Sequence, residues 1–106
     1  MATTPEFVSY VCDQIRETGM VRFKKMFGEY MVYVDDKPLL LVCDNTVYVK
    51  PLECVAALLA AAPLAAPYNG AKEHRVLDID DARLAGEVVR ALLPVVPVPK
   101  PKKKKA

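Results

Sequence analysis

The sequence predicts an α+β fold in two layers, in which helices cover one face of an antiparallel sheet of four to five strands. Three observations support this fold class. Residues 29–50 form short strand-like segments, largely alternating, that are separated by two turn sequences. Apolar residues recur at helical spacing near both ends of the chain, and an alanine-rich helical stretch follows the strands. The order expected from these patterns is helix, three strands, helix, one or two strands and helix.

The first helix is expected from Pro5 to Thr18. Thr4 can cap it, and proline suits the first helical position because that position needs no N–H donor. Gly19 is a natural stop. The apolar face of this helix is formed by Phe7, Val8, Val11, Cys12 and Ile15.

A three-strand meander is expected next, at residues 29–34, 39–43 and 46–50. Residues 21–26 fit either an extended lead-in or a further short strand. Asp35-Asp36-Lys37-Pro38 is expected to form a turn, with Pro38 entering the next strand. Asp44-Asn45 is expected to form a two-residue turn, since both residue types tolerate positive φ angles. Strands joined by such tight turns are antiparallel.

The chain beyond Pro51 is expected to alternate helix and strand again. Pro63 ends the second helix, Asp80-Asp81 caps the third, and Pro94 ends it. The expected elements are a helix at 52–62, a loop at 64–72 with a short edge strand near 67–69, a strand at 73–79 and a helix at 81–93.

The charge distribution divides the chain into a folded domain at residues 1–94 and a flexible Pro/Lys-rich tail at residues 95–106. The net charge is +2, but the tail holds five of the fifteen basic residues. Residues 1–99 carry 10 basic and 13 acidic residues, a balance of −3. A nucleic-acid surface spread over the whole domain is therefore disfavoured. The lysines of the tail are Lys100, Lys102, Lys103, Lys104 and Lys105.

The three cysteines, Cys12, Cys43 and Cys54, are expected to be buried free thiols. Their number is odd and they show no CxxC spacing. The N-terminus lacks the basic start and apolar run of a signal peptide. We therefore expect a cytoplasmic protein. No apolar stretch approaches the ~20 residues of a membrane span, so we expect no membrane contact.

The central stretch resembles the N-terminal domain of the TfoX/Sxy competence-regulator family. The matching residues are Met26-Phe27-Gly28, Tyr30, Val32-Tyr33-Val34-Asp35, Lys37, Leu41-Val42-Cys43-Asp44 and Val47-Tyr48-Val49-Lys50. The sequence departs from the family pattern at Lys25, Glu29, Met31 and Asp36, and it has no room for the second domain of the complete regulators.

The resemblance implies a stand-alone domain whose fold is similar to that of type III secretion chaperones. Its order would be a helix, three strands, a helix, two strands and a helix, so the resemblance adds a strand near residue 67. It also implies a regulatory role, in competence or in transcription control, exerted through protein contacts.

Neither a catalytic constellation nor a cofactor motif is apparent. His74 is the sole histidine, and a zinc site needs about four ligands. Sequences typical of nucleotide-binding loops and of serine hydrolases are absent. The prediction is a protein that is not an enzyme and has no cofactor and no metal.

Two clusters are candidates for contact with a partner. Arg22, Lys24 and Lys25 form a basic cluster interleaved with Phe23, Phe27 and Tyr30, and Tyr30, Tyr33 and Tyr48 could form an aromatic cluster across neighbouring strands. The residues of the first cluster favour a solvated strand edge whose charges prevent pairing, with a contact site as the alternative. The second cluster can also be ordinary packing. The predicted partner is another protein or a second copy of the chain. The alternative is an accessory nucleic-acid-binding protein that uses the basic cluster and the lysine tail. The tail is equally interpreted as a solubilising segment with no specific partner.

Overall fold

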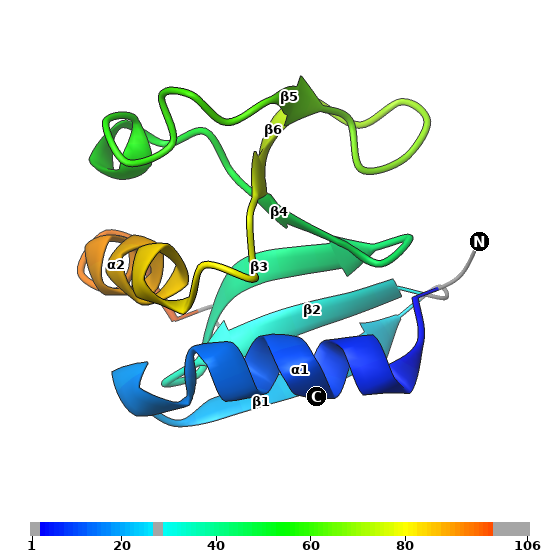
Figure 1. The fold of residues 1–106 in the computed structure, drawn as a ribbon, viewed down its shortest axis with the longest axis vertical. Helices are drawn as coiled ribbons and strands as arrows, with labels where there is room; N and C mark the ends of the chain where they lie inside the picture. Colours follow the sequence, from blue (N-terminus) through cyan, green and yellow to red (C-terminus); the bar gives the residue numbers. More distant parts are fainter. Residues whose placement is uncertain (1–2, 27–28, 99–106) are drawn as a thin grey trace, which may run out of the picture.

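A computed structural model describes residues 3–26 and 29–98 of the chain. Within these ranges an antiparallel sheet of six strands is combined with two α-helices (Figure 1). The elements are α1 Pro5–Gln14, the 3₁₀ turn η1 Arg16–Thr18, β1 Val21–Met26, β2 Glu29–Val34, β3 Lys37–Cys43, β4 Thr46–Val49, the 3₁₀ turn η2 Glu53–Val55, β5 Leu64–Ala65, β6 His74–Leu77 and α2 Ala82–Leu92.

The strands lie in the order β1-β2-β3-β4-β6-β5, and every neighbouring pair is antiparallel. The β2–β3 and β3–β4 turns place Asp35, Asp36, Asp44 and Asn45 at φ angles between 51° and 67°. The two-residue turn predicted at Asp44-Asn45 is confirmed, whereas the turn predicted over residues 35–38 is shorter, because β3 already begins at Lys37. Both turns fix the register of the meander. The α+β class and the antiparallel meander are confirmed.

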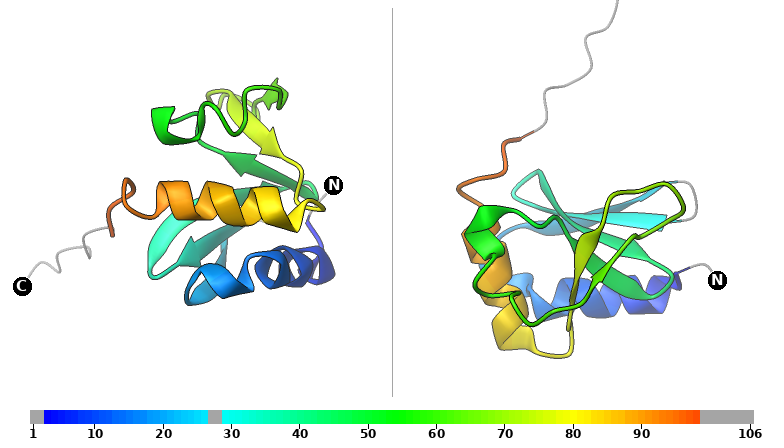
Figure 2. Two further views of the ribbon diagram at one scale, coloured as in Figure 1. Left: turned by 60° about the vertical axis from the view of Figure 1, so that its left-hand side comes forward. Right: turned by 90° about the horizontal axis from the view of Figure 1, so that it is seen from above.

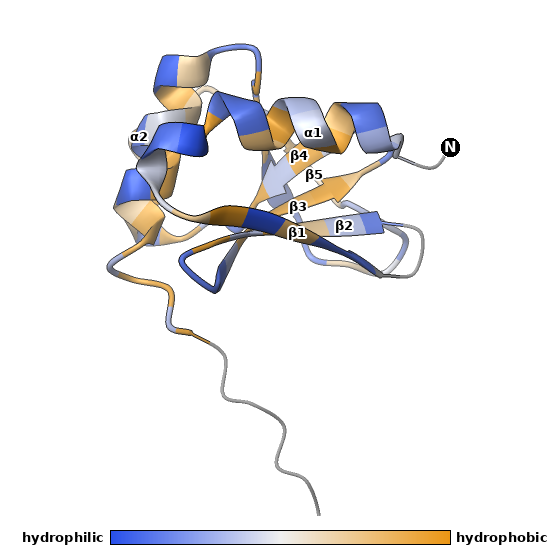
Figure 3. Ribbon diagram, turned by 90° about the horizontal axis from the view of Figure 1, so that it is seen from below, coloured by the Kyte–Doolittle hydropathy of each residue, from blue (hydrophilic) through white to orange (hydrophobic). Residues whose placement is uncertain are grey.

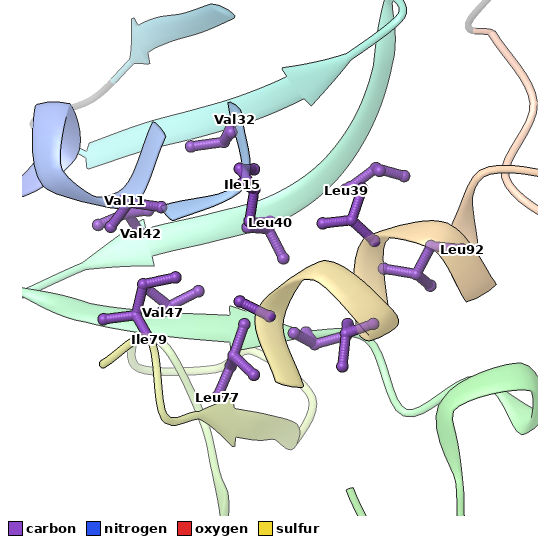
Figure 4. Packing of buried hydrophobic residues seen from close by; sticks show 14 of the residues in the cluster. Val11, Ile15, Val32, Leu39, Leu40, Val42, Val47, Leu77, Ile79 and Leu92 are labelled. Atoms are coloured by element: carbon purple, nitrogen blue, oxygen red, sulfur yellow. The ribbon is translucent and has the colours of Figure 1, made fainter. Parts of the chain in front are cut away.

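Both helices contact the same face of the strongly twisted sheet, and the chain leaving α2 turns toward the opposite side (Figure 2). The core lies between them. Val11 of α1 and Ile15, which directly follows that helix, meet Val32, Leu40 and Val42 of the sheet, while α2 packs over Leu39 and Leu77 (Figure 4). Each of these side chains is at most 6% exposed.

The first helix begins as predicted but ends four residues earlier. The Thr4 hydroxyl accepts a hydrogen bond from the Phe7 N–H at 3.2 Å, which confirms the cap. After Gln14 the backbone tightens into η1, where the Thr18 hydroxyl donates to the Ile15 carbonyl at 2.7 Å. A side chain that satisfies a terminal carbonyl favours this change from α to 3₁₀.

The prediction of four to five strands is too low for the described residues. Residues 21–26 form β1, paired with β2 along its whole length. The short strand expected near 67–69 lies instead at Leu64–Ala65. Pro67 has no N–H for a ladder, and Gly70 at φ 91° belongs to a turn, so the chain bends at the predicted position.

The predicted second helix at 52–62 is wrong. Only Glu53–Val55 is helical, as the 3₁₀ turn η2, and the residues up to Ala61 form successive turns. High alanine content favours a helix, but a short segment bounded by Pro51 and Pro63 gains little without packing. Val55 and Leu59 are its fully buried side chains.

The last predicted helix is confirmed as α2, with Asp81 as its cap. The Asp81 carboxylate accepts a hydrogen bond from the Leu84 N–H at 3.0 Å. Its buried side is Ala85, Gly86, Val88, Val89 and Leu92. Within the described ranges, neither helix has the length and apolar character needed to cross a membrane.

Candidate functional site

The two faces of the sheet differ in what covers them. In β2 the side chains of Tyr30, Val32 and Val34 are buried under the helices, and the alternate residues are half-buried on the other side. We call this other side the open face. Its residues include Arg22, Lys24, Met31, Tyr33, Leu41, Tyr48, Lys50 and His74, as the strand register requires. Figure 3 shows β3 hydrophobic and β1 with hydrophilic stretches along this sheet.

The basic cluster predicted at β1 lies along an edge of the sheet and is divided between its two faces. Arg22 and Lys24 belong to the open face, whereas Lys25 lies opposite Tyr30 on the helix-covered face. All three are exposed. The Arg22 guanidinium is 2.7 Å from the Asp36 carboxylate and 5.4 Å from the centre of the Tyr33 ring, so it is held within the molecule.

Lys24 and Lys25 have no ion-pair or hydrogen-bond partner among the residues that the structure describes. They remain the candidates for contact at this edge. Phe27 and the five tail lysines predicted as contact residues lie outside the described residues.

The three predicted contact tyrosines do not form one cluster. Tyr30 is 5% exposed in the core, and its ring lies 5.5 Å from that of Phe23 in a T-shaped arrangement. Tyr33 and Tyr48 are on the open face, on strands separated by β3. Successive side chains of a strand point to opposite faces, so Tyr30 and Tyr33 lie on different faces of β2. The predicted aromatic cluster of Tyr30, Tyr33 and Tyr48 did not take this alternation into account.

The open face holds a hollow of about 180 Å³ that the sequence did not reveal. It lies where the middle of the sheet meets the end of α2 and the segment that follows. Apolar side chains make up most of its lining, and three polar ones border it. The apolar residues are Met31, Pro38, Leu39, Leu41, Leu52, Leu92 and Val96, and the polar ones are Tyr48, Lys50 and His74.

The polar groups of the hollow show no catalytic arrangement among the described residues. The His74 Nδ1 is 2.9 Å from the Lys72 carbonyl oxygen, as expected for a histidine that serves local structure. Lys50 is exposed, and no described residue pairs with its ammonium group. A hollow of this composition can bind an apolar group and attract a negative charge.

Cys43 is the last residue of β3, two positions beyond Leu41 of the hollow, and it lies beside Glu29. Burial, together with the Glu29 carboxylate and the charge of Asp44, raises the pKa of the Cys43 thiol to about 12. A thiol with such a pKa stays protonated at neutral pH and is a poor nucleophile. Burial also raises the pKa of Cys12, with Asp13 adding to the shift. All three cysteines are free.

A second, wider groove lies between α1 and α2. It has a volume of about 640 Å³ and is bordered by charges of both signs, among them Arg16, Glu17, Arg83 and Arg90. Arg16 pairs with Asp13 and Arg83 with Glu87. In the described ranges no group of three or more His, Cys, Asp or Glu is placed to hold a metal ion.

Comparison with known proteins gives one family and one curated relative. The model of the TfoX N-terminal domain family matches residues 13–86. An uncharacterized 12.7 kDa protein in the trpE 5′ region of Spirochaeta aurantia is 35% identical over 107 residues, which cover 99% of this chain and 93% of that protein. No solved structure matches the chain significantly.

Proposed function

The chain belongs to the TfoX N-terminal domain family, and we propose that it is a non-enzymatic regulatory domain that acts through protein contacts. We further propose that this domain serves the regulation of competence or of transcription. The observation that carries the proposal is the open face, where apolar side chains surround a hollow together with Lys50, which no described residue pairs with. Surface of this kind, apolar at its centre and polar at its rim, is typical of binding sites.

The location of the nucleophilic groups supports binding over catalysis. The Cys43 thiol is 1% exposed and has a raised pKa, and His74 bonds to a backbone carbonyl. A catalytic nucleophile needs the opposite environment, with a lowered pKa or a neighbouring base. The proposal therefore assigns these residues to structure.

Gene replacement in the native host tests the regulatory role. The gene is deleted and restored as wild type, as Met31→Glu/Leu41→Glu, or as the control Arg83→Glu on the opposite side. Transcript levels are then measured. We expect deletion to change a limited set of transcripts, and wild type and control to restore them. The open-face variant should not restore them.

Unchanged transcripts after deletion would contradict the regulatory role. Full restoration by the open-face variant would contradict the role of the open face. Both variants are first purified and their thermal unfolding is compared with that of the wild type. If the double variant unfolds at a lower temperature, the exposed-site variant Lys50→Glu replaces it.

The alternative is an accessory nucleic-acid-binding protein. It is favoured by Lys24 and Lys25 at the β1 edge, which have no partner among the described residues, and by the five lysines of residues 100–105. It predicts binding of DNA or RNA that falls steeply between about 50 and 200 mM salt and weakens when residues 100–106 are removed. Fluorescence anisotropy measures both effects, and equal binding by the full and shortened chains would reject a role of the tail.

A further inference from the structure

We propose that the hollow of the open face binds an acidic protein segment through one large apolar side chain. This inference rests on the proposed function, and it adds the chemistry of the partner. It depends on three properties of the described residues: the size of the hollow, the exposed chain beside it, and the sign of the charge at its rim.

The size of the hollow suits a single side chain. Its volume of about 180 Å³ is below the roughly 300–1,000 Å³ of pockets that enclose small-molecule ligands. Met31 and Leu41 form its floor on adjacent strands, directly opposite each other in the register. A Leu, Met or Phe side chain of a partner would cover these two residues, which the protein itself leaves half-buried.

The segment after α2 extends the apolar surface without filling it. Val96 borders the hollow, whereas the neighbouring Val95 and Val98 are each 53% exposed. These two exposed valines give a partner additional apolar surface to contact next to the hollow. Val96 therefore forms one border of the hollow, while about half of the Val98 side chain remains accessible to a partner.

The charge at the rim selects an acidic partner. Lys50 borders the hollow and has no partner among the described residues, and Lys24 lies on the same face beside Met31. The chain continues from Val98 directly into residues 99–106, which carry five lysines and no acidic residue. The lysines are therefore tethered within a few residues of Val96.

The same charges argue against a second copy as the occupant. A symmetric pair joined through the open face would bring two copies of Lys50 and of Lys24 together. Like charges opposed across an interface disfavour association. The acidic partner thus explains the apolar hollow and the basic rim at once.

Peptide selection tests the proposal on the full chain. A displayed library of random peptides is selected against the protein, and enriched peptides are titrated while amide chemical shifts are recorded. We expect acidic sequences with one large apolar residue, and shifts concentrated at Leu41, Tyr48 and Val96. Peptides that shift other surfaces, peptides without acidic character, or a failure to enrich any peptide would overturn the proposal.

Matched variants separate specific binding from general charge attraction. Lys50→Glu should weaken the selected peptide about tenfold or more, since it places a like charge at the rim. Arg83→Glu makes the same charge change near the start of α2, on the other side of the molecule, and should leave affinity unchanged. Equal loss in both variants would overturn the proposal. So would a DNA oligonucleotide that competes with the peptide at the same amides, which would identify nucleic acid as the occupant.

The outcome also separates this inference from the proposed function. Peptides that bind only at the β1 edge would refute the hollow as the docking site and leave a role in protein contacts intact. If deletion of the gene leaves all transcripts unchanged, the regulatory function fails, whatever the peptides do.

Discussion

The helix-covered face and the open face of the same sheet are built from alternating residues of the same strands, yet they serve different purposes. Leu40 is fully buried under the helices, and its neighbour Leu41 is half-buried on the other side. The covered face gains its stability from packing. The open face keeps apolar side chains that no helix in the described ranges covers. An apolar surface retained in this way is available to a partner.

The largest expected effect compares the two leucines directly. Leu40→Ala should lower the free energy of unfolding by about 2–5 kcal/mol because it leaves a cavity in the core. Leu41→Ala removes the same atoms from a half-buried site and should cost about 1 kcal/mol. Urea unfolding followed by circular dichroism measures both. Equal losses would show that the open face is as tightly packed as the covered one.

Gly19 lies close to the β2–β3 turn and to Val34 of the covered face. Replacing Gly19 should cause the next largest loss in the free energy of unfolding. A Cβ atom there would lie 2.9 Å from the Asp35 carboxylate oxygens and from a Val34 methyl group. The Asp35 carboxylate accepts a hydrogen bond from the Met20 N–H at 2.9 Å, so it cannot move freely. Gly19→Ala should lower the free energy of unfolding by about 1–3 kcal/mol.

A double-mutant cycle checks the cause of that loss. Asp35→Asn keeps the size of the side chain at position 35, so the new methyl group of Gly19→Ala should still be crowded by it. The stability losses of Gly19→Ala and Asp35→Asn should therefore add. Asp35→Gly removes the crowding atoms, and the combined loss should be smaller than the sum. Additive losses with both Asp35 variants would contradict the role of Asp35 in the close approach.

Alkaline pH is expected to weaken the fold through Cys43, at a site on the open face. The folded protein raises the pKa of this thiol from 9.0 to about 12. Below pH 9 both states keep the proton, and the contribution to stability is complete. Between pH 9 and 12 the unfolded chain releases the proton more readily, so stability falls as the pH rises, by at most about 1.4 kcal/mol per pH unit.

The difference between wild type and Cys43→Ala isolates this effect, because other groups titrate in both proteins. Urea unfolding is measured from pH 8 to pH 11. The wild type should lose stability relative to the variant as the pH increases. A difference that is constant with pH would show that the Cys43 thiol titrates alike in the folded and unfolded chains.

The smallest expected effect comes from Arg22 on the open face. Its ion pair with Asp36 joins two exposed side chains, and its guanidinium also lies over Tyr33. Exposed contacts of these kinds contribute about 0.2–1 kcal/mol each. Arg22→Ala should lower the free energy of unfolding by about 1 kcal/mol or less, and Arg22→Lys by less still. A larger loss would mean that the β1 edge supports the fold more than its exposure indicates.

Sequence patterns were most informative where one face of a strand is buried and the other is not. The alternation from Glu29 to Val34 follows directly from this asymmetry, and Asp44-Asn45 supplied the turn that fixes the register. The helix predicted at residues 52–62 was wrong because composition alone supported it. Their helical composition was not matched by enough buried contacts, and tertiary packing decides the state of so short a segment.

The candidate site was only partly predictable. Lys24 and Lys25 could be recognised as candidates because they form a basic cluster with Arg22 within four positions of the sequence. The hollow combines residues from β2, β3, β4 and the segment after α2, and Val96 is more than 50 positions from Met31 and Leu41. No local pattern reports such a juxtaposition. The separation of Tyr30 from Tyr33, in contrast, could have been deduced from strand alternation.

Site-specific photocrosslinking in the native host tests most directly whether the open face is the contact surface. A photoreactive amino acid is placed at Lys50 on the open face or at Arg83 on the helix-covered side. Our account predicts a discrete crosslinked protein from position 50 that is absent from position 83, and its loss when Met31→Glu/Leu41→Glu is added. Crosslinking from position 83 alone, or none from position 50, would contradict the assignment of binding to the open face.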